Sequence, residues 1–168
     1  RVELERPVYR AAWPQRFNTY SKTMTHPGDE YHRVIGRCEQ VAVNGYLLRQ
    51  VPAAEQHAPG AFFADVTNQT LSVWDSANRD LNKAFVEASV RPEIWRVEGE
   101  HVQVRGLRFR NAANAAQRGA VVLAGRHGVL EDCTVEEMNS SGAAFLGEHL
   151  TVRRCVFLHN GQLGFSAN

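Results

Sequence analysis

The chain has 168 residues, of which 43% are hydrophobic and 22% charged, a composition that excludes a disordered or fibrous chain and fits one or two small globular domains. Its 19 Lys and Arg residues are balanced by 18 Asp and Glu residues, and the charges are scattered along the chain, so no nucleic-acid partner is expected. No apolar run approaches the roughly 18–20 residues that cross a bilayer, so no membrane span is expected.

The first 33 residues carry weak signals, and three prolines interrupt them. We expect residues 1–33 to be an irregular N-terminal segment. Three side chains of this segment, His26, Asp29 and His32, are of the kind that ligate metals, but the Pro27-Gly28 turn breaks any regular spacing between them. We therefore expect no metal and no cofactor, with these three residues as the alternative metal site.

Residues 34–92 predict a small antiparallel β-module. Asn44-Gly45 stands between Val41–Val43 and Tyr46–Leu48, and an Asn-Gly pair supplies the positive φ angles of a type I′ hairpin turn. A second pair of strand-like segments, Gly60–Asp65 and Leu71–Trp74, flanks a polar turn and predicts another hairpin.

Residues 93–168 contain a repeat. Val104–Arg110, Leu130–Glu136 and Val152–Leu158 align with offsets of 26 and 22 residues, and a second series begins at glycines 119, 142 and 164, with offsets of 23 and 22 residues. Each unit alternates as a strand does and lacks the 3.6-residue period of a helix. Three short strands in about 22 residues predict a three-sheet parallel β-solenoid of about three coils.

The alignment also predicts which side chains stack. The inward columns are Leu107–Cys133–Cys155, Phe109–Val135–Phe157 and Ala120–Ala143–Phe165, with Val122 over Phe145 beside the last. Outward, Arg105, Glu131 and Arg153 alternate in charge, which stabilises adjacent strands. Cys133 and Cys155 are expected as stacked, buried thiols, because a small buried hydrophobe is the commonest role of a free cysteine.

The chain resembles the right-handed parallel β-helix proteins of the pectin-lyase-like superfamily. The segments that carry the resemblance are Gln40–Gly45, Pro59–Asp65, Leu71–Trp74, Val86–Arg91, Val104–Phe109 and the turn Asn160–Gly164. Within the superfamily, the likeness is to glycoside hydrolases with an associated β-sandwich module, and it covers residues 37–168. It implies an all-β fold, a secreted or cell-envelope protein and a polysaccharide or oligosaccharide partner.

The resemblance defines fold more sharply than chemistry, because this superfamily includes hydrolases, lyases, epimerases, adhesins and phage spikes. We expect a fragment of a secreted, polysaccharide-degrading glycoside hydrolase whose catalytic carboxylates lie beyond residue 168, so that this chain alone is inactive. The alternatives are a non-catalytic glycan-binding or adhesin-type solenoid and a polysaccharide lyase or epimerase. The uncapped end of the solenoid is expected to allow self-association.

The resemblance implies that carbohydrate lies on the outer face of the sheet that contains the Gly119, Gly142 and Gly164 strands. The expected outward residues of this sheet are Val121, Leu123, Ala144, Leu146, Ser166 and Asn168. The four apolar members are expected to pack under the N-terminal module, because a large apolar patch usually marks an interface. Ser166 and Asn168 are candidate substrate-binding residues.

The turns that flank this sheet supply the other candidates. Gln117, Ser140 and Gln162 share a column before the strands, and their amides and hydroxyl suit sugar hydroxyls. After the strands, Arg126 is aligned with His149, and Glu148 with Gly125; Glu148, His149 and Arg126 are the candidates for acid, base or charge stabiliser. A glycosidase needs two carboxylates, and this alignment gives Glu148 no carboxylate neighbour. Solvated turn residues are the alternative for all of these positions.

Overall fold

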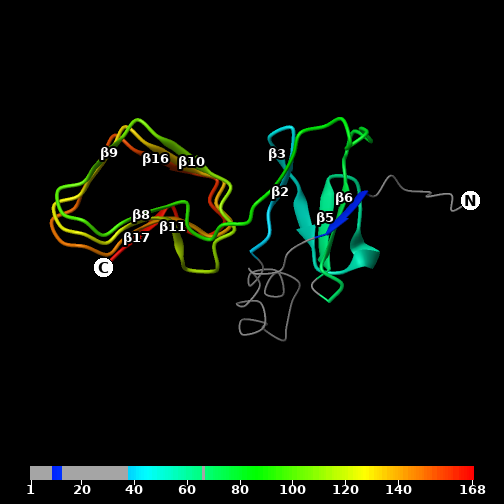
Figure 1. Ribbon diagram of the computed structural model, residues 1–168, viewed down its shortest axis with the longest axis horizontal. Coiled ribbons are helices and arrows are strands. Elements are labelled where there is room, and N and C mark those ends of the chain that lie inside the picture. The colour runs from blue at the N-terminus through cyan, green and yellow to red at the C-terminus, as the bar shows by residue number, and fades with distance from the viewer. Residues whose placement is uncertain (1–8, 13–37, 66) are drawn as a thin grey trace, which may run out of the picture. The chain divides into compact units, whose positions relative to one another are not determined.

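The computed structural model describes residues 9–12, 38–65 and 67–168 (Figure 1). The described chain is all-β apart from one 3-10 turn, η1 (Ala54–Gln56), and none of its helices is long and apolar enough to cross a membrane. It forms two compact units, Arg1–Ser89 and Val90–Asn168.

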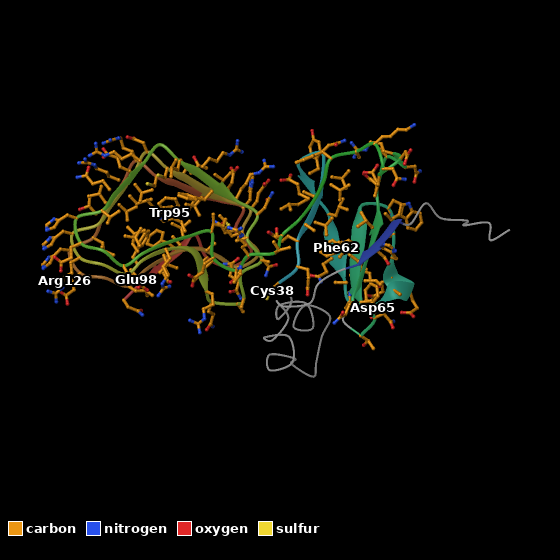
Figure 2. The ribbon with its side chains drawn as sticks, in the orientation of Figure 1. Cys38, Phe62, Asp65, Trp95, Glu98 and Arg126 are labelled. Atoms are coloured by element: carbon orange, nitrogen blue, oxygen red, sulfur yellow. The ribbon has the colours of Figure 1, made fainter. Side chains whose placement is uncertain are left out.

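The first unit contains two small sheets. Their strands are β1 (Tyr9–Ala12), β2 (Val41–Val43), β3 (Tyr46–Leu47), β4 (Arg49–Val51), β5 (Ala61–Asp65), β6 (Thr70–Trp74) and β7 (Val86–Ala88). The strand orders are β1-β6-β5-β4 and β3-β2-β7. Buried side chains from both sheets, Phe62 among them (Figure 2), form one apolar core with Leu81.

Both predicted hairpins are present. In the first, β2 and β3 pair antiparallel around Asn44 (φ 50°) and Gly45 (φ 83°), the left-handed conformations that a tight hairpin turn requires. In the second, β5 and β6 pair antiparallel over their whole length.

Two strands of this unit were not expected. Strand β1 lies inside the segment predicted to be irregular and pairs antiparallel with β6, and β4 pairs parallel with β5. Both are short edge strands with no clear alternation of apolar residues, so backbone pairing with a neighbour, rather than side-chain pattern, defines them.

The Asp75–Arg79 ion pair makes the first unit acid-sensitive. The Asp75 carboxylate is 2% exposed and accepts hydrogen bonds from Arg79 Nε (2.8 Å) and the Arg79 amide (3.0 Å). The hydrogen bond from the Arg79 side chain, together with its charge, lowers the pKa of Asp75 to about 2.

Because the folded-state pKa of Asp75 lies below its unfolded value, the stabilisation is present above about pH 4 and is lost as the pH falls towards 2. We expect Asp75→Asn to lower the stability of this unit by about 1 kcal/mol at pH 7, after allowing for the partly exposed arginine, and to flatten its acid unfolding between pH 4 and 2. Circular dichroism across this range measures both. An unchanged acid profile would contradict the assignment.

The second unit is a parallel β-solenoid with three sheets. Its strands are β8 (Trp95–Val97), β9 (Gln103–Arg105), β10 (Arg108–Arg110), β11 (Gly119–Leu123), β12 (Val129–Glu131), β13 (Thr134–Glu136), β14 (Ser141–Phe145), β15 (Thr151–Arg153), β16 (Val156–Leu158) and β17 (Phe165–Ala167). The sheets have the orders β17-β14-β11-β8, β15-β12-β9 and β10-β13-β16, and Figure 1 shows the coils overlaid. All these pairs are parallel, as the repeat predicts.

Each coil turns at three residues with left-handed backbone. One corner has Gly106, Asp132 and Arg154, where the sequence predicts a kink, and the others have histidines 101, 127 and 149 and the column Asn111, Glu137 and His159. A positive φ is uncommon outside glycine, and here it recurs at equivalent positions of successive coils. The turning of the chain is therefore built into each repeat.

The inward columns of two sheets agree with the sequence alignment. Phe109 pairs with Val135 and Val135 with Phe157, and Leu130 lies between Val104 and Val152. Cys133 is buried in the core and Cys155 packs against it, both as free thiols, while Leu107, the first member of that column, is exposed. Burial raises the pKa of the Cys155 thiol.

The remaining sheet, β17-β14-β11-β8, is called the third sheet below. Its predicted register is wrong by one residue between the strands that the alignment began at Gly119 and Gly142. Gly119 pairs with Ser141, so Val121 lies over Ala143 and Leu123 over Phe145. Val121 and Leu123 are core residues rather than outward ones. The glycine match misled the alignment, because the burial of apolar side chains, here Val121 and Leu123 over Ala143 and Phe145, specifies the register.

The outward charge column is also present. The buried Glu131 carboxylate pairs with Arg105 Nε (2.7 Å) on one side, and with Arg153 Nε (2.8 Å) and Arg154 on the other. Hydrogen bonds from Arg153, and then from Arg154, lower the pKa of Glu131. Ion pairs therefore connect the three coils along the outside of this sheet.

Candidate functional site

The column predicted before the strands of the third sheet forms a connected polar cluster, the rim cluster, of Gln117, Ser140 and Gln162. The backbone N–H of Gln117 donates to Ser140 Oγ (3.0 Å) and to Gln162 Oε1 (2.8 Å), and Ser140 Oγ donates to the same Oε1 (2.6 Å). Ser140 is buried, Gln162 is half-buried and Gln117 is exposed. The structure thus brings together the three rim residues that the sequence analysis aligned.

Asn114, which the sequence analysis did not select, supports this cluster from inside the solenoid. It is fully buried; its Nδ2 donates to the Ser141 carbonyl (2.8 Å) and to the Arg118 carbonyl, and its Oδ1 accepts from the Ser140 amide (3.0 Å). A buried amide that satisfies backbone groups of two coils fixes the position of Ser140. The signal in the sequence was a lone polar residue between two alanine pairs.

The corner after the strands repeats a glycine, a charged residue and a histidine in three coils: Gly99-Glu100-His101, Gly125-Arg126-His127 and Gly147-Glu148-His149. The three imidazole rings stack with centroids 4.8 and 5.0 Å apart and nearly parallel planes. Figure 2 shows Arg126 directed outward at this corner.

Two sequence-based alignments at this corner are wrong. Arg126 aligns with Glu148 and not with His149, and the counterpart of Glu148 is Arg126 and not Gly125. Arg126 and Glu148 form an ion pair of 3.2 Å, with both side chains exposed. The one-residue error of the third sheet carries through into this corner.

The ion pair limits what Glu148 can do. A glycosidase needs two carboxylates about 5–10 Å apart that flank the bond, whereas the neighbour of Glu148 is a guanidinium. The His149 ring stacks on the His127 ring. The structure therefore places the three catalytic candidates at one corner, where Glu148 is ion-paired with Arg126.

The outer face of the third sheet carries the row Arg96, Val122, Ala144 and Ser166, which pair in register. Val122 and Ala144 are buried, at 3% and 7% exposed, whereas Leu146 is exposed. Ser166 is half-buried and Asn168 exposed, so polar groups replace apolar ones towards the last coil. Neither is among the hydrogen-bonded residues of the rim cluster.

Glu93 and Glu98 are two further carboxylates on this sheet that the sequence analysis missed. Arg96 Nε lies 2.7 Å from Glu98 Oε1, and Arg96 Nη1 lies 3.3 Å from Glu93 Oε1; all three side chains are exposed. Period-two spacing puts Arg96 and Glu98 on one face of the strand segment, a signal that was available. Like Glu148, both are held by a cation.

The alternative metal ligands His26, Asp29 and His32 lie outside the described residues. In residues 9–12, 38–65 and 67–168 no group of three His, Cys, Asp or Glu side chains is arranged to hold a metal ion.

The second unit is therefore a parallel β-solenoid that carries the rim cluster of polar residues at one edge of its third sheet. A structure of XylC in complex with xylose is similar to this chain, with a TM-score of 0.56 and 16% sequence identity over 84% of this chain. The chain spans 28% of that protein's length. At this identity the likeness shows the shared fold, which is consistent with the pectin-lyase-like resemblance. No family model and no curated protein matches the sequence.

Proposed function

We propose that this chain binds saccharide at the rim cluster, as part of a carbohydrate-active β-solenoid protein. The observation that carries the proposal is the cluster itself: Gln162 directs its Oε1 to Ser140 and Gln117, and its Nε2 group is a donor of the kind that sugar hydroxyls accept. Such preorganised polar groups on a rigid scaffold are typical of ligand sites.

The fold likeness supports the same ligand class. The similar structure contains XylC with xylose, and the sequence resembles the pectin-lyase-like superfamily, which includes polysaccharide hydrolases and lyases. We infer xylose-containing or related neutral polysaccharides as the first ligands to test. The resemblance further supports a secreted or cell-envelope location.

For the complete catalytic protein we propose a glycoside hydrolase of that superfamily. In the described part of this chain, the carboxylates of Glu93, Glu98 and Glu148 are each paired with an arginine. We assign none of them to a pair that flanks a glycosidic bond. The proposal therefore assigns binding, and not turnover, to the described residues.

The binding proposal predicts that Gln162→Ala weakens the affinity for xylo-oligosaccharides about 5–10-fold, the effect of losing about one hydrogen bond. Affinity electrophoresis in soluble xylan, followed by calorimetry with xylo-oligosaccharides, measures it. Gln103→Ala is the matched control, because Gln103 is an exposed amide on a different sheet, and it should leave affinity unchanged.

Circular dichroism of both variants establishes that each retains the fold. Failure of the unmodified chain to bind any member of a panel of neutral and acidic polysaccharides would overturn the proposal. So would equal affinity of the Gln162→Ala and Gln103→Ala variants.

A further inference from the structure

The chain contains two asparagine–glycine pairs, Asn44-Gly45 and Asn160-Gly161. Asparagine followed by glycine is chemically labile, because the glycine amide nitrogen can attack the side-chain carbonyl carbon of the asparagine, and glycine has no Cβ to hinder the approach. The structure holds the nitrogen atoms of the two pairs differently, and this difference predicts which pair reacts.

The Asn44-Gly45 pair forms the two-residue turn between β2 and β3, where Asn44 is exposed and both residues have positive φ. Asn44 Oδ1 accepts a hydrogen bond from the Phe85 amide (2.9 Å). Within the described residues, no group accepts a hydrogen bond from the Gly45 amide or from Asn44 Nδ2. In that part of the chain, neither the attacking nitrogen nor the leaving nitrogen has to break a hydrogen bond before the reaction.

The Asn160-Gly161 pair is held at both nitrogen atoms. The Gly161 amide donates to the Met138 carbonyl (2.9 Å), and Asn160 Nδ2 donates to the Val135 carbonyl (3.3 Å). Asn160 Oδ1 accepts from the Met138 amide (3.1 Å), so the hydrogen bond at Oδ1 is common to both asparagines. The backbone is also confined, because a Cβ at Gly161 would lie 2.0 Å from the Asn139 carbonyl oxygen. This turn must open locally before the pair can react.

We propose that Asn44 is a site of spontaneous deamidation, a covalent modification that the fold permits here and blocks at Asn160. The Gly45 nitrogen forms a bond to Asn44 Cγ, the Cγ–Nδ2 bond breaks, and ammonia leaves with the proton of the Gly45 amide. Negative charge develops on Oδ1 during the attack, and the Phe85 N–H that is directed at this oxygen stabilises it. Water then opens the succinimide ring at either carbonyl carbon, which gives aspartate or isoaspartate at position 44.

The two products have different effects on the hairpin. Aspartate keeps an oxygen that can accept the Phe85 hydrogen bond, and it tolerates positive φ as asparagine does. Isoaspartate adds a methylene group to the backbone of a two-residue turn whose length sets the register of β2 and β3. The isoaspartate form should therefore lose the pairing of β2 with β3, whereas the aspartate form should keep it. The modification is independent of saccharide binding at the rim cluster.

Incubation of the whole chain in mildly alkaline buffer, followed by tryptic digestion and mass spectrometry, tests the proposal. Cleavage after Arg37 and Arg49 isolates Asn44, and cleavage after Arg154 isolates Asn160, so each pair is the control for the other in one sample. We expect deamidation of the folded chain to be at least about tenfold faster at Asn44, because Asn160 reacts only after local opening. In urea the two rates should converge, because the fold no longer distinguishes the pairs.

Equal rates at Asn44 and Asn160 in the folded chain would overturn the proposal, and so would a rate ratio that urea leaves unchanged. A sample digested before incubation corrects for deamidation during the digestion. Hydrogen exchange at the Tyr46 and Leu47 amides separates the two products: it should be faster in the isoaspartate form than in the Asn44→Asp variant. Equal exchange in the two forms would contradict the predicted loss of β2–β3 pairing.

Discussion

Gly125→Ala is expected to destabilise the solenoid by about 3 kcal/mol, the upper part of the range for overpacking at a site with no room to relax. The added methyl group would overlap the Gly99 carbonyl oxygen, and the Gly99 carbonyl carbon and Glu98 carbonyl carbon are also close. Because these are backbone atoms, a rotamer change cannot relieve the overlap, and the two coils must separate locally. Gly147→Ala meets the Gly125 carbonyl in the same way and should cost a similar amount.

Gly99→Ala is the matched control for both substitutions. It occupies the same position of the first coil, but its added methyl group would lie 3.4 Å from Val102 Cγ2, an ordinary contact distance. We expect a change of less than about 1 kcal/mol in either direction. Urea denaturation followed by circular dichroism compares the variants, and equal stabilities of Gly99→Ala and Gly125→Ala would refute the close stacking of coils at this corner.

Asn114→Ala should be of similar severity, about 3 kcal/mol. It removes the partner of the buried Ser140 amide and of the Ser141 and Arg118 carbonyl groups, and unsatisfied buried backbone groups cost about 1–3 kcal/mol each before relaxation. Because Ser140 belongs to the rim cluster, the variant should also lose saccharide affinity, which links this prediction to the proposed site.

Asn82→Ala provides the comparison for a lost amide at the surface. Asn82 is exposed and bonds to the neighbouring Asp80, so its loss should change stability by less than about 0.5 kcal/mol. Thermal unfolding of both variants and hydrogen exchange at the amides of Ser140 and Ser141 distinguish the two cases. Retained protection of those amides in Asn114→Ala would show that the amide does not hold the rim.

The parts of the fold that sequence reasoning predicted correctly are those with local signals. The Asn44-Gly45 turn carries its own backbone preference, and the offsets of 26 and 22 residues align two sheets of the solenoid through apolar alternation and the Arg105–Glu131–Arg153 charges. The edge strands β1 and β4 have no such pattern, and they were missed.

The same contrast holds at the candidate site. The rim cluster was found because its polar residues recur before equivalent strands, and the structure confirms that they contact one another. The Arg126–Glu148 pair was misaligned, and Asn114, Glu93 and Glu98 were not selected. The Arg126–Glu148 error was not visible from residue type, because it depends on which residues are neighbours across coils. Asn114 and Glu98 did carry sequence signals, a lone polar residue among alanines and a period-two spacing from Arg96.

The sequence by itself determined that the second half of the chain is a repeat of solenoid coils, because each repeat contains its own alternation of apolar side chains and its own charged positions. Only the tertiary structure decided the register of the third sheet. There the connection of residues 111–118 is four residues longer than its counterpart of residues 137–140 in the next coil. The repeat does not give the length of such a loop; where the strand begins follows from which side chains the folded coil buries, here Val121 and Leu123. The observed register, shifted by one residue from the predicted one, places Val121 and Leu123 in the core and pairs Arg126 with Glu148.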